Sequence, residues 1–136
     1  MQRKDLKKIK FYKQDLDSMN FKKESFDAIM SIAVFHCFLK KDREKYINKI
    51  NYLLRDNGIL FQLVLSSKDT KIRLNQKIEK NTFLRKTGIA FHLFTKSELK
   101  EYFSNFEFLS LKFLNESKDE NSVWVMILRK KCSKKI

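Results

Sequence analysis

The sequence predicts one α/β domain whose sheet is parallel except for a terminal antiparallel strand pair. Two nearly continuous apolar runs, FDAIMSIAV at 26–34 and ILFQLVL at 59–65, flank an amphipathic helix at 41–54. Strands buried on both faces have this pattern, and a strand, helix and strand in succession form a right-handed parallel unit. A chain of 136 residues forms one domain with its own core. We expect the domain to span 1–128 and a basic tail to follow at 129–136.

The remaining N-terminal and central segments are shorter. Lys8–Gln14 (KIKFYKQ) predicts a strand that ends at the turn-forming residues 15–18. In the helix, apolar residues recur at spacings of three and four, and Asp56-Asn57-Gly58 follows as a stop signal. Thr70–Gly88 is polar with scattered apolar residues, which leaves a helix and a mobile excursion open.

The C-terminal third predicts a helix and two strands. Thr95 and Glu98 have the spacing of a capping box, so a helix begins after Thr95 and ends near Asn105. Phe106–Leu114 alternates apolar and polar residues, and Val123–Leu128 is continuously apolar. Because only a short polar link joins these two strands, we expect them to be antiparallel neighbours.

The chain is strongly basic, with 30 Lys and Arg against 16 Asp and Glu and a net charge of +14. Such a charge suits binding to phosphates through counterion release. However, 24 of the basic residues are Lys and only six are Arg, and Arg is the better fork for phosphate and guanine. A generally basic solvated surface is therefore favoured over a selected nucleic-acid surface.

Other classes of protein are excluded by what the sequence lacks. No apolar run reaches the roughly 18 to 20 residues that cross a bilayer, and no apolar signal core follows the N-terminal charges. We therefore expect a cytoplasmic protein that does not bind membranes. Cys37 and Cys132 have no metal-ligand spacing to each other or to the two histidines, so we expect no metal site.

Five stretches of this layout together resemble a known family. They are KFYKQDL, NFKKESFDAIMSIAVFHCF, INYLLRDNGILF, HLFTKSELKEYFSNFEFLSL and VWVMILRKK. They resemble the second half of a class I S-adenosylmethionine-dependent methyltransferase, from the third strand of its Rossmann-like sheet onward. The pairing of SFDAIMSIAVFH with LLRDNGIL is the most specific feature, and EKNTF with HLFTKSEL is similar to the small-molecule branch that includes tellurite-resistance-like enzymes.

The resemblance implies a partial sheet with the family order 4-5-7-6. Val123–Leu128 would then lie antiparallel between Ile59–Leu65 and Phe106–Leu114, and Lys8–Gln14, without its usual neighbour, would be displaced or poorly ordered. The family's Gly-rich cofactor turn and ribose-binding acid have no counterpart, since Gly58 and Gly88 are isolated. The resemblance therefore implies an N-terminally truncated fragment that is inactive alone.

The matching positions also imply site residues for the cofactor S-adenosylmethionine. Asp15 resembles the acid that accepts a hydrogen bond from the adenine amino group, with the Leu16 amide facing the adjacent ring nitrogen. Ser31 and Ile32 would lie beside the sulfonium and methionine portion. Judged from the residues alone, Asp15 is as well explained as a turn cap, and Ser31 and Ile32 as core residues.

Two histidines are weak candidates for a catalytic role. His36 follows the 26–34 strand at a family position near the methyl-transfer centre, and His92 lies just before the capping box. An imidazole at either position could take a proton from a substrate or orient it. Judged from the residues alone, each is better explained as a structural histidine.

The function implied is methyl transfer to a small-molecule acceptor by in-line displacement. Two alternatives stay open. The chain could be a non-catalytic partner or scaffold fragment that a second chain completes, or a basic RNA-binding module that stacks bases on Phe11, Tyr12 and Tyr46. No RNA-binding motif supports the last alternative, so we do not expect nucleic acid as a partner.

Overall fold

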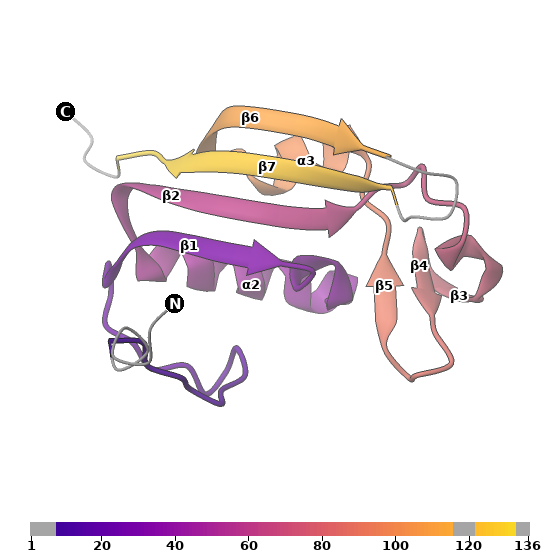
Figure 1. Cartoon of the computed structure of the whole chain (residues 1–136), viewed down its shortest axis with the longest axis horizontal. Coiled ribbons are helices and arrows are strands. Elements are labelled where there is room, and N and C mark those ends of the chain that lie inside the picture. The colour runs from indigo at the N-terminus through magenta and orange to yellow at the C-terminus, as the bar shows by residue number, and fades with distance from the viewer. Residues whose placement is uncertain (1–7, 116–121, 133–136) are drawn as a thin grey trace.

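The computed structural model describes residues 8–115 and 122–132. Within them, the chain forms a four-stranded sheet of order β1-β2-β7-β6 and a separate three-stranded sheet of order β3-β4-β5 (Figure 1). The strands are β1 (Phe26–Ile32), β2 (Leu54–Leu65), β3 (Gln76–Glu79), β4 (Thr82–Leu84), β5 (Ala90–His92), β6 (Phe106–Leu114) and β7 (Val123–Lys130). The helices are α2 (Lys40–Leu53) and α3 (Lys96–Tyr102), with the 3-10 turns η1 (Phe35–Cys37) and η2 (Ile72–Leu74).

The larger sheet has the predicted order. β1 and β2 are parallel and connected through α2, while β7 lies antiparallel between β2 and β6. The helices α2 and α3 lie behind this sheet in the view of Figure 1. The predicted α/β class, with a partial Rossmann-like sheet and a terminal antiparallel pair, is confirmed.

The core lies between this sheet and the two helices. Leu60 of β2, Met126 and Leu128 of β7 are fully buried against side chains of α2 and α3. Phe35 lies at the centre of this cluster and stacks on the Phe94 ring with 4.8 Å between ring centroids. The amphipathic face predicted for the helix thus meets the apolar face predicted for the strands.

The predicted stop signal after α2 is a bend inside β2. Asn57 has a φ of 63°, and the pairing of β1 with β2 jumps from Phe26–Leu54 to Ala28–Ile59. A Cβ added to Gly58 would lie 2.7 Å from the Leu54 Cγ atom. Glycine is therefore required for the chain to turn from the helix into the strand.

The capping box of α3 is present as predicted. Thr95 Oγ1 accepts a hydrogen bond from the Glu98 amide at 3.1 Å, and the Thr95 amide donates to Glu98 Oε1 at 3.0 Å. The helix ends at Tyr102, and a turn at 103–105 leads into β6.

Two predictions for other segments are wrong. Lys8–Gln14 is not a strand, although it is displaced from the sheet as the resemblance implied; without a neighbouring strand, its amides have no ladder to join. Thr70–Gly88 is neither one helix nor an excursion, because it forms η2, β3 and β4. These short strands pair with β5 and do not enter the larger sheet, so the predicted order holds.

The boundary of the basic tail is also different. β7 continues through Lys130, whose side chain is 4% exposed and donates to Asn51 O at 2.6 Å and Leu54 O at 2.7 Å. These carbonyls lie at the C-terminal end of α2, where a cation is favoured. Burial of this one lysine extends the strand into the segment predicted as tail, and residues 133–136 lie outside the described part.

Candidate cofactor pocket

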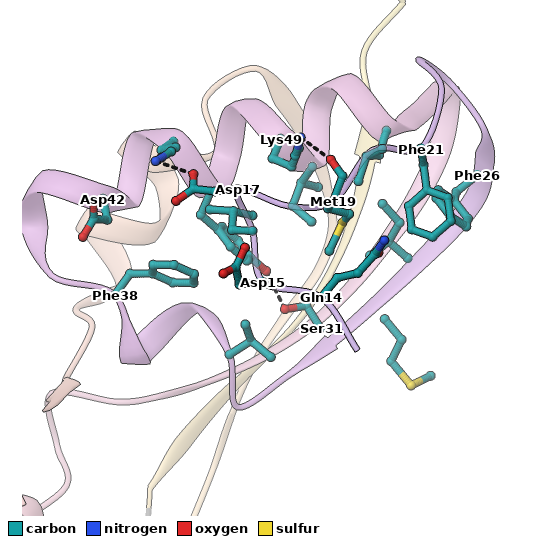
Figure 2. A pocket seen from close by; sticks show the side chains of 18 of the residues that line it. Gln14, Asp15, Asp17, Met19, Phe21, Phe26, Ser31, Phe38, Asp42 and Lys49 are labelled. Atoms are coloured by element: carbon teal, nitrogen blue, oxygen red, sulfur yellow. Dashed lines mark hydrogen bonds and ion pairs between the residues drawn. The ribbon is translucent and has the colours of Figure 1, made fainter. Parts of the chain in front are cut away.

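A pocket of about 770 Å³ lies between the segment 14–21, β1 and α2 (Figure 2). Its lining residues are Gln14, Asp15, Leu16, Asp17, Met19, Phe21, Phe26, Ala28, Ile29, Met30, Ser31, Val34, Phe38, Asp42, Lys45, Tyr46, Lys49, Ile50 and Leu53. Ser31 and Val34 stand at the carboxyl end of β1, the edge of a parallel sheet at which α/β proteins bind ligands.

The wall formed by residues 14–21 is attached to α2. Lys49 Nζ donates to the Met19 carbonyl at 2.9 Å, and Lys45 forms an ion pair with Asp17. Phe21 packs edge-on against Phe26 of β1 with 5.1 Å between ring centroids. This part of the chain thus remains beside β1 without forming a strand.

Asp15 is both a turn residue and a pocket residue. Its Oδ1 accepts from the Ser18 amide at 2.8 Å, and its own amide donates to Ser18 Oγ at 3.0 Å. The backbone hydrogen bond from Ser18 holds the pKa of the Asp15 carboxyl below its ordinary value. Asp15 is therefore an ionised hydrogen-bond acceptor at neutral pH.

Ser31 belongs to a buried polar group beneath the pocket. It is 6% exposed, and its Oγ lies 2.5 Å from the hydroxyl of Tyr46, which donates to Gln62 Oε1 at 2.7 Å. Burial raises the pKa of Tyr46 to about 12, so its hydroxyl stays protonated.

The structure brings three of the four predicted cofactor residues together. Asp15, Leu16 and Ser31 line the same pocket, whereas Ile32 is 50% exposed and is not part of the lining. Ile32 points away because successive side chains of a strand alternate between faces. Whether these residues bind a cofactor stays a prediction.

Sequence reasoning missed Tyr46 and Gln62 as parts of this site. Tyr46 is 2% exposed, so it is unavailable as the stacking platform that an RNA-binding module would need, whereas Phe11 and Tyr12 are exposed. The available signal was Gln62, the one polar residue in the apolar run ILFQLVL, because a buried amide requires partners.

His36 is held as a neutral imidazole at the ends of β1 and β2. It is 4% exposed, and its Nδ1 accepts a hydrogen bond from the Leu65 amide at 3.1 Å. Burial, with a smaller contribution from His92, lowers the pKa of His36 to about 4. The proton of the neutral ring therefore sits on Nε2, and this histidine is a hydrogen-bond donor with very little basicity.

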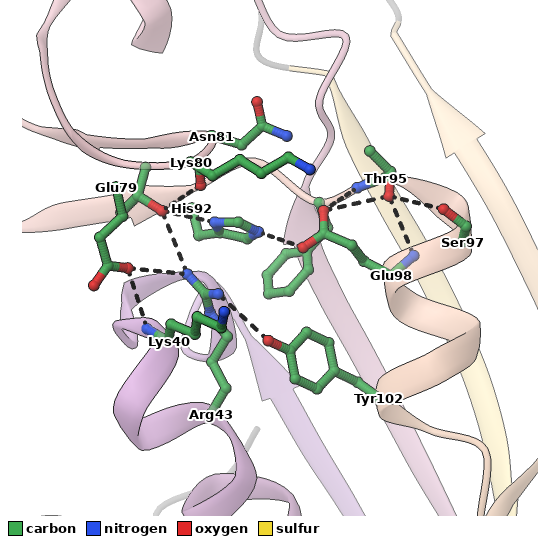
Figure 3. Close-up of polar contacts among 12 residues, drawn as sticks. Lys40, Arg43, Glu79, Lys80, Asn81, His92, Thr95, Ser97, Glu98 and Tyr102 are labelled. Carbon is green, nitrogen blue, oxygen red and sulfur yellow. Dashed lines mark hydrogen bonds and ion pairs between the residues drawn. The ribbon is translucent and has the colours of Figure 1, made fainter.

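His92 lies in a separate polar network (Figure 3). It is 2% exposed; Nδ1 lies 2.7 Å from Thr82 Oγ1 and Nε2 lies 2.8 Å from Glu98 Oε2. Burial raises the pKa of Glu98, but hydrogen bonds from His92 and the Thr95 amide outweigh it and hold the pKa below its ordinary value. His92 is not among the residues that line the pocket.

Arg43 joins this network to α2. It is 3% exposed and donates to Phe38 O at 3.2 Å, Tyr102 OH at 3.4 Å and Thr82 Oγ1 at 3.4 Å. Its guanidinium also lies 3.8 Å from the Glu79 carboxylate. Arg43 and His92 thus attach the small sheet to both helices.

In 8–115 and 122–132, no group of three or more His, Cys, Asp or Glu could hold a metal ion. Cys37, which is half-buried, and Cys132, which is exposed, are free thiols. In the same ranges, no helix has the length and apolarity to cross a membrane.

Comparisons with known proteins show which domain and which fold this chain is similar to. Residues 1–62 match the model of a methyltransferase domain. A search of curated protein sequences gave no match. Many solved structures share the fold, so the family evidence comes from the domain model and from structure.

Three of these structures illustrate the likeness. A S-adenosylmethionine-dependent methyltransferase from Methanosarcina mazei is 20% identical, with a TM-score of 0.74 over 87% of this chain and 65% of its own. The 1,6-didemethyltoxoflavin-N1-methyltransferase of Burkholderia thailandensis, solved with 1,6-didemethyltoxoflavin and S-adenosylhomocysteine, is 18% identical, with a TM-score of 0.67 over 86% of this chain and 48% of its own. TehB from Haemophilus influenzae is 21% identical, with a TM-score of 0.57 over 87% of this chain and 40% of its own.

The chain spans between two fifths and two thirds of the length of these three proteins. Their identities to it are so similar that no branch of the family is singled out, and the tellurite-resistance-like branch stays a prediction. Residues 1–62 thus match a methyltransferase domain, and the described residues share the fold of S-adenosylmethionine-dependent methyltransferases.

Proposed function

We propose that the chain is part of an S-adenosylmethionine-dependent methyltransferase that acts on a small molecule. The observation that supports this most is the pocket, which gathers Asp15, Leu16 and Ser31 from separate segments at the carboxyl end of β1. In the proposed arrangement the Asp15 carboxylate accepts a hydrogen bond from the adenine amino group. Ser31 lies beside the methionine portion, whereas Ile32, which is not part of the lining, has no contact in this arrangement.

When bound, the cofactor supplies an electrophilic methyl group on a good leaving group, so positioning supplies most of the rate. The chain's own residues then bind, orient and exclude water. His36 has no proton-transfer role in this scheme, because a pKa of about 4 makes it a poor base, and it is buried outside the pocket lining. His92, tied to Thr82 and Glu98, holds the small sheet in place.

We further propose that the chain alone is inactive, because its site is incomplete. The sequence contains no Gly-rich turn to approach the methionine part and no counterpart of the ribose acid. If those contacts are worth about 3 to 5 kcal/mol, a micromolar site weakens by two to four decades, into the millimolar range. Such binding is too weak to support turnover at ordinary cofactor concentrations.

Among the described residues, β1 is an edge strand of the larger sheet. This supports the proposal that further strands complete the sheet and the site. In the described residues, β1 has β2 as its only neighbour, and Met30 on it is 69% exposed. A parallel strand with an apolar sequence ordinarily lies inside a sheet. The missing strands could belong to a longer form of this chain or to a second chain, in which case this chain is the partner fragment.

The test is to read the DNA upstream of Met1 for an in-frame Gly-rich strand, turn and helix, and to express the extended protein. We expect the extended protein to bind S-adenosylmethionine with micromolar affinity and to methylate a small-molecule acceptor, and Asp15→Ala to abolish the binding. If the extended protein fails to bind the cofactor, the proposed function is wrong. If no such upstream sequence exists, co-expression with a candidate partner chain is the corresponding experiment.

A further inference from the structure

One polar side chain of the pocket, that of Ser31, has its hydrogen bonding set by buried side chains behind it. Ser31 lines the pocket, and behind it Tyr46 and Gln62 continue into the core as a row of buried polar side chains. The row ends at Met126, whose Sδ lies 3.8 Å from Gln62 Nε2. Gln62 and Met126 are fully buried, so this end of the row has no access to water.

The end of the row sets the direction of every hydrogen bond in it. A thioether sulfur accepts hydrogen bonds but donates none, so the amide of Gln62 turns its NH₂ toward Met126 and its oxygen toward Tyr46. The Tyr46 hydroxyl has one proton and donates it to Gln62 Oε1 at 2.7 Å. Tyr46 can then only accept from Ser31, whose own single proton is used in that bond.

We infer that Gln62 and Tyr46 fix Ser31 as a hydrogen-bond acceptor toward the pocket, so that the pocket selects a ligand with an amino or ammonium group at this point. Tyr46 and Gln62 are positioning residues, since they act through Ser31. The inference rests on the proposed function, which puts the methionine portion of the cofactor beside Ser31. Its α-amino group is the donor that fits.

The surroundings of Ser31 favour the same kind of ligand. Asp15, Asp17 and Asp42 also line the pocket, although the chain as a whole is strongly basic. Lys45 is paired with Asp17, and Lys49 donates to the Met19 carbonyl. A cationic group that donates hydrogen bonds is therefore favoured over an anion.

The first test examines the row without any ligand. In nuclear magnetic resonance spectra of the full chain, we expect nuclear Overhauser contacts between the side-chain amide protons of Gln62 and the methyl group of Met126. We expect these contacts to persist in Ser31→Ala. Contacts of the amide protons with the Tyr46 hydroxyl proton instead would mean that the row runs in the opposite direction, and the inference would be overturned whatever the chain binds.

The second test uses S-adenosylhomocysteine and its analogue without the α-amino group, at millimolar concentrations, followed by amide chemical shifts. We expect the amino ligand to bind about tenfold more tightly to the wild-type chain, the size of one charge-assisted hydrogen bond. Ser31→Ala should bring the two ligands to nearly equal affinity, and Tyr46→Phe, which frees the Ser31 hydroxyl to donate as well as to accept, should narrow the difference between them. Ser110→Ala, a matched change on β6 outside the pocket lining, should leave the ratio as it was.

Two outcomes separate the inference from the proposed function. Equal affinity of both ligands for the wild-type chain, or an unchanged ratio in Tyr46→Phe, overturns the inference and leaves the cofactor assignment standing. Failure of both ligands to shift any amide in the chain and in its extended form contradicts the proposed function, and with it the selection of an amino group.

Discussion

β1 and β2 have similar apolar sequences but opposite surroundings. In β2, Leu60, Gln62 and Val64 are fully buried, whereas β1 buries only Ser31 and leaves Met30 69% exposed. β2 has a strand on each side, and β1 has one neighbour among the described residues. An apolar run therefore predicts that a strand exists, whereas the number of neighbouring strands depends on the rest of the sheet.

The largest expected effect is on stability. Leu60→Ala in β2 should lower the free energy of unfolding by about 2 to 5 kcal/mol, because it leaves a cavity in the core. Met30→Ala in β1 should change it by less than about 0.5 kcal/mol. Urea denaturation of the two variants measures both values, and equal losses would mean that β1 is covered in solution.

The second prediction concerns His36, which follows β1 and accepts a hydrogen bond from the Leu65 amide of β2. Burial lowers the pKa of His36 from 6.5 to about 4, so the unfolded chain binds a proton more readily than the folded chain. Its contribution to stability is complete above pH 6.5 and is lost as the pH falls toward 4, by up to about 3 kcal/mol.

His36→Gln serves as the reference for this effect, because its amide oxygen can still accept from the Leu65 amide and does not titrate. Thermal unfolding of both proteins between pH 7.5 and 4.5 cancels the contribution of the carboxylates they share. The wild-type chain should lose stability relative to His36→Gln on acidification. A constant difference across this range would show that His36 is accessible to protons in the folded chain.

The smallest effect on folding should come from the open edge of β1. An exposed apolar edge strand pairs with other chains, and a lysine on it opposes such pairing. Met30→Lys should therefore reduce self-association in sedimentation velocity runs at high protein concentration while leaving the unfolding free energy nearly unchanged. Lys112→Met on β6, the other edge strand of this sheet in the described residues, is the matched reverse change, and we expect it to increase self-association for the same reason.

The elements that could be predicted are those whose signals are local and long. The capping box at Thr95 and Glu98 needs only four residues, and the apolar runs of β1 and β2 exceed six. The small sheet could not be predicted, because its strands have only three or four residues each and are held by Arg43 and His92 through contacts with distant residues. Local propensity has little weight where such contacts decide the structure.

The candidate site also has a part that the sequence predicts and a part that it does not. Asp15, Leu16 and Ser31 came from a resemblance that covers whole motifs, and the structure puts them in one pocket. The partnership of Ser31 with Tyr46 and Gln62 joins residues on β1, α2 and β2. No sequence spacing indicates a contact of this kind, because it arises only when the helix packs on the sheet.

We propose that this chain holds part of a methyltransferase cofactor site and that this part alone does not bind the cofactor tightly. Calorimetric titration of the 136-residue chain with S-adenosylmethionine tests it most directly. We expect no measurable heat of binding at micromolar to submillimolar concentrations of the cofactor. A micromolar dissociation constant, abolished by Asp15→Ala, would contradict the claim and show that the pocket is complete without a Gly-rich turn.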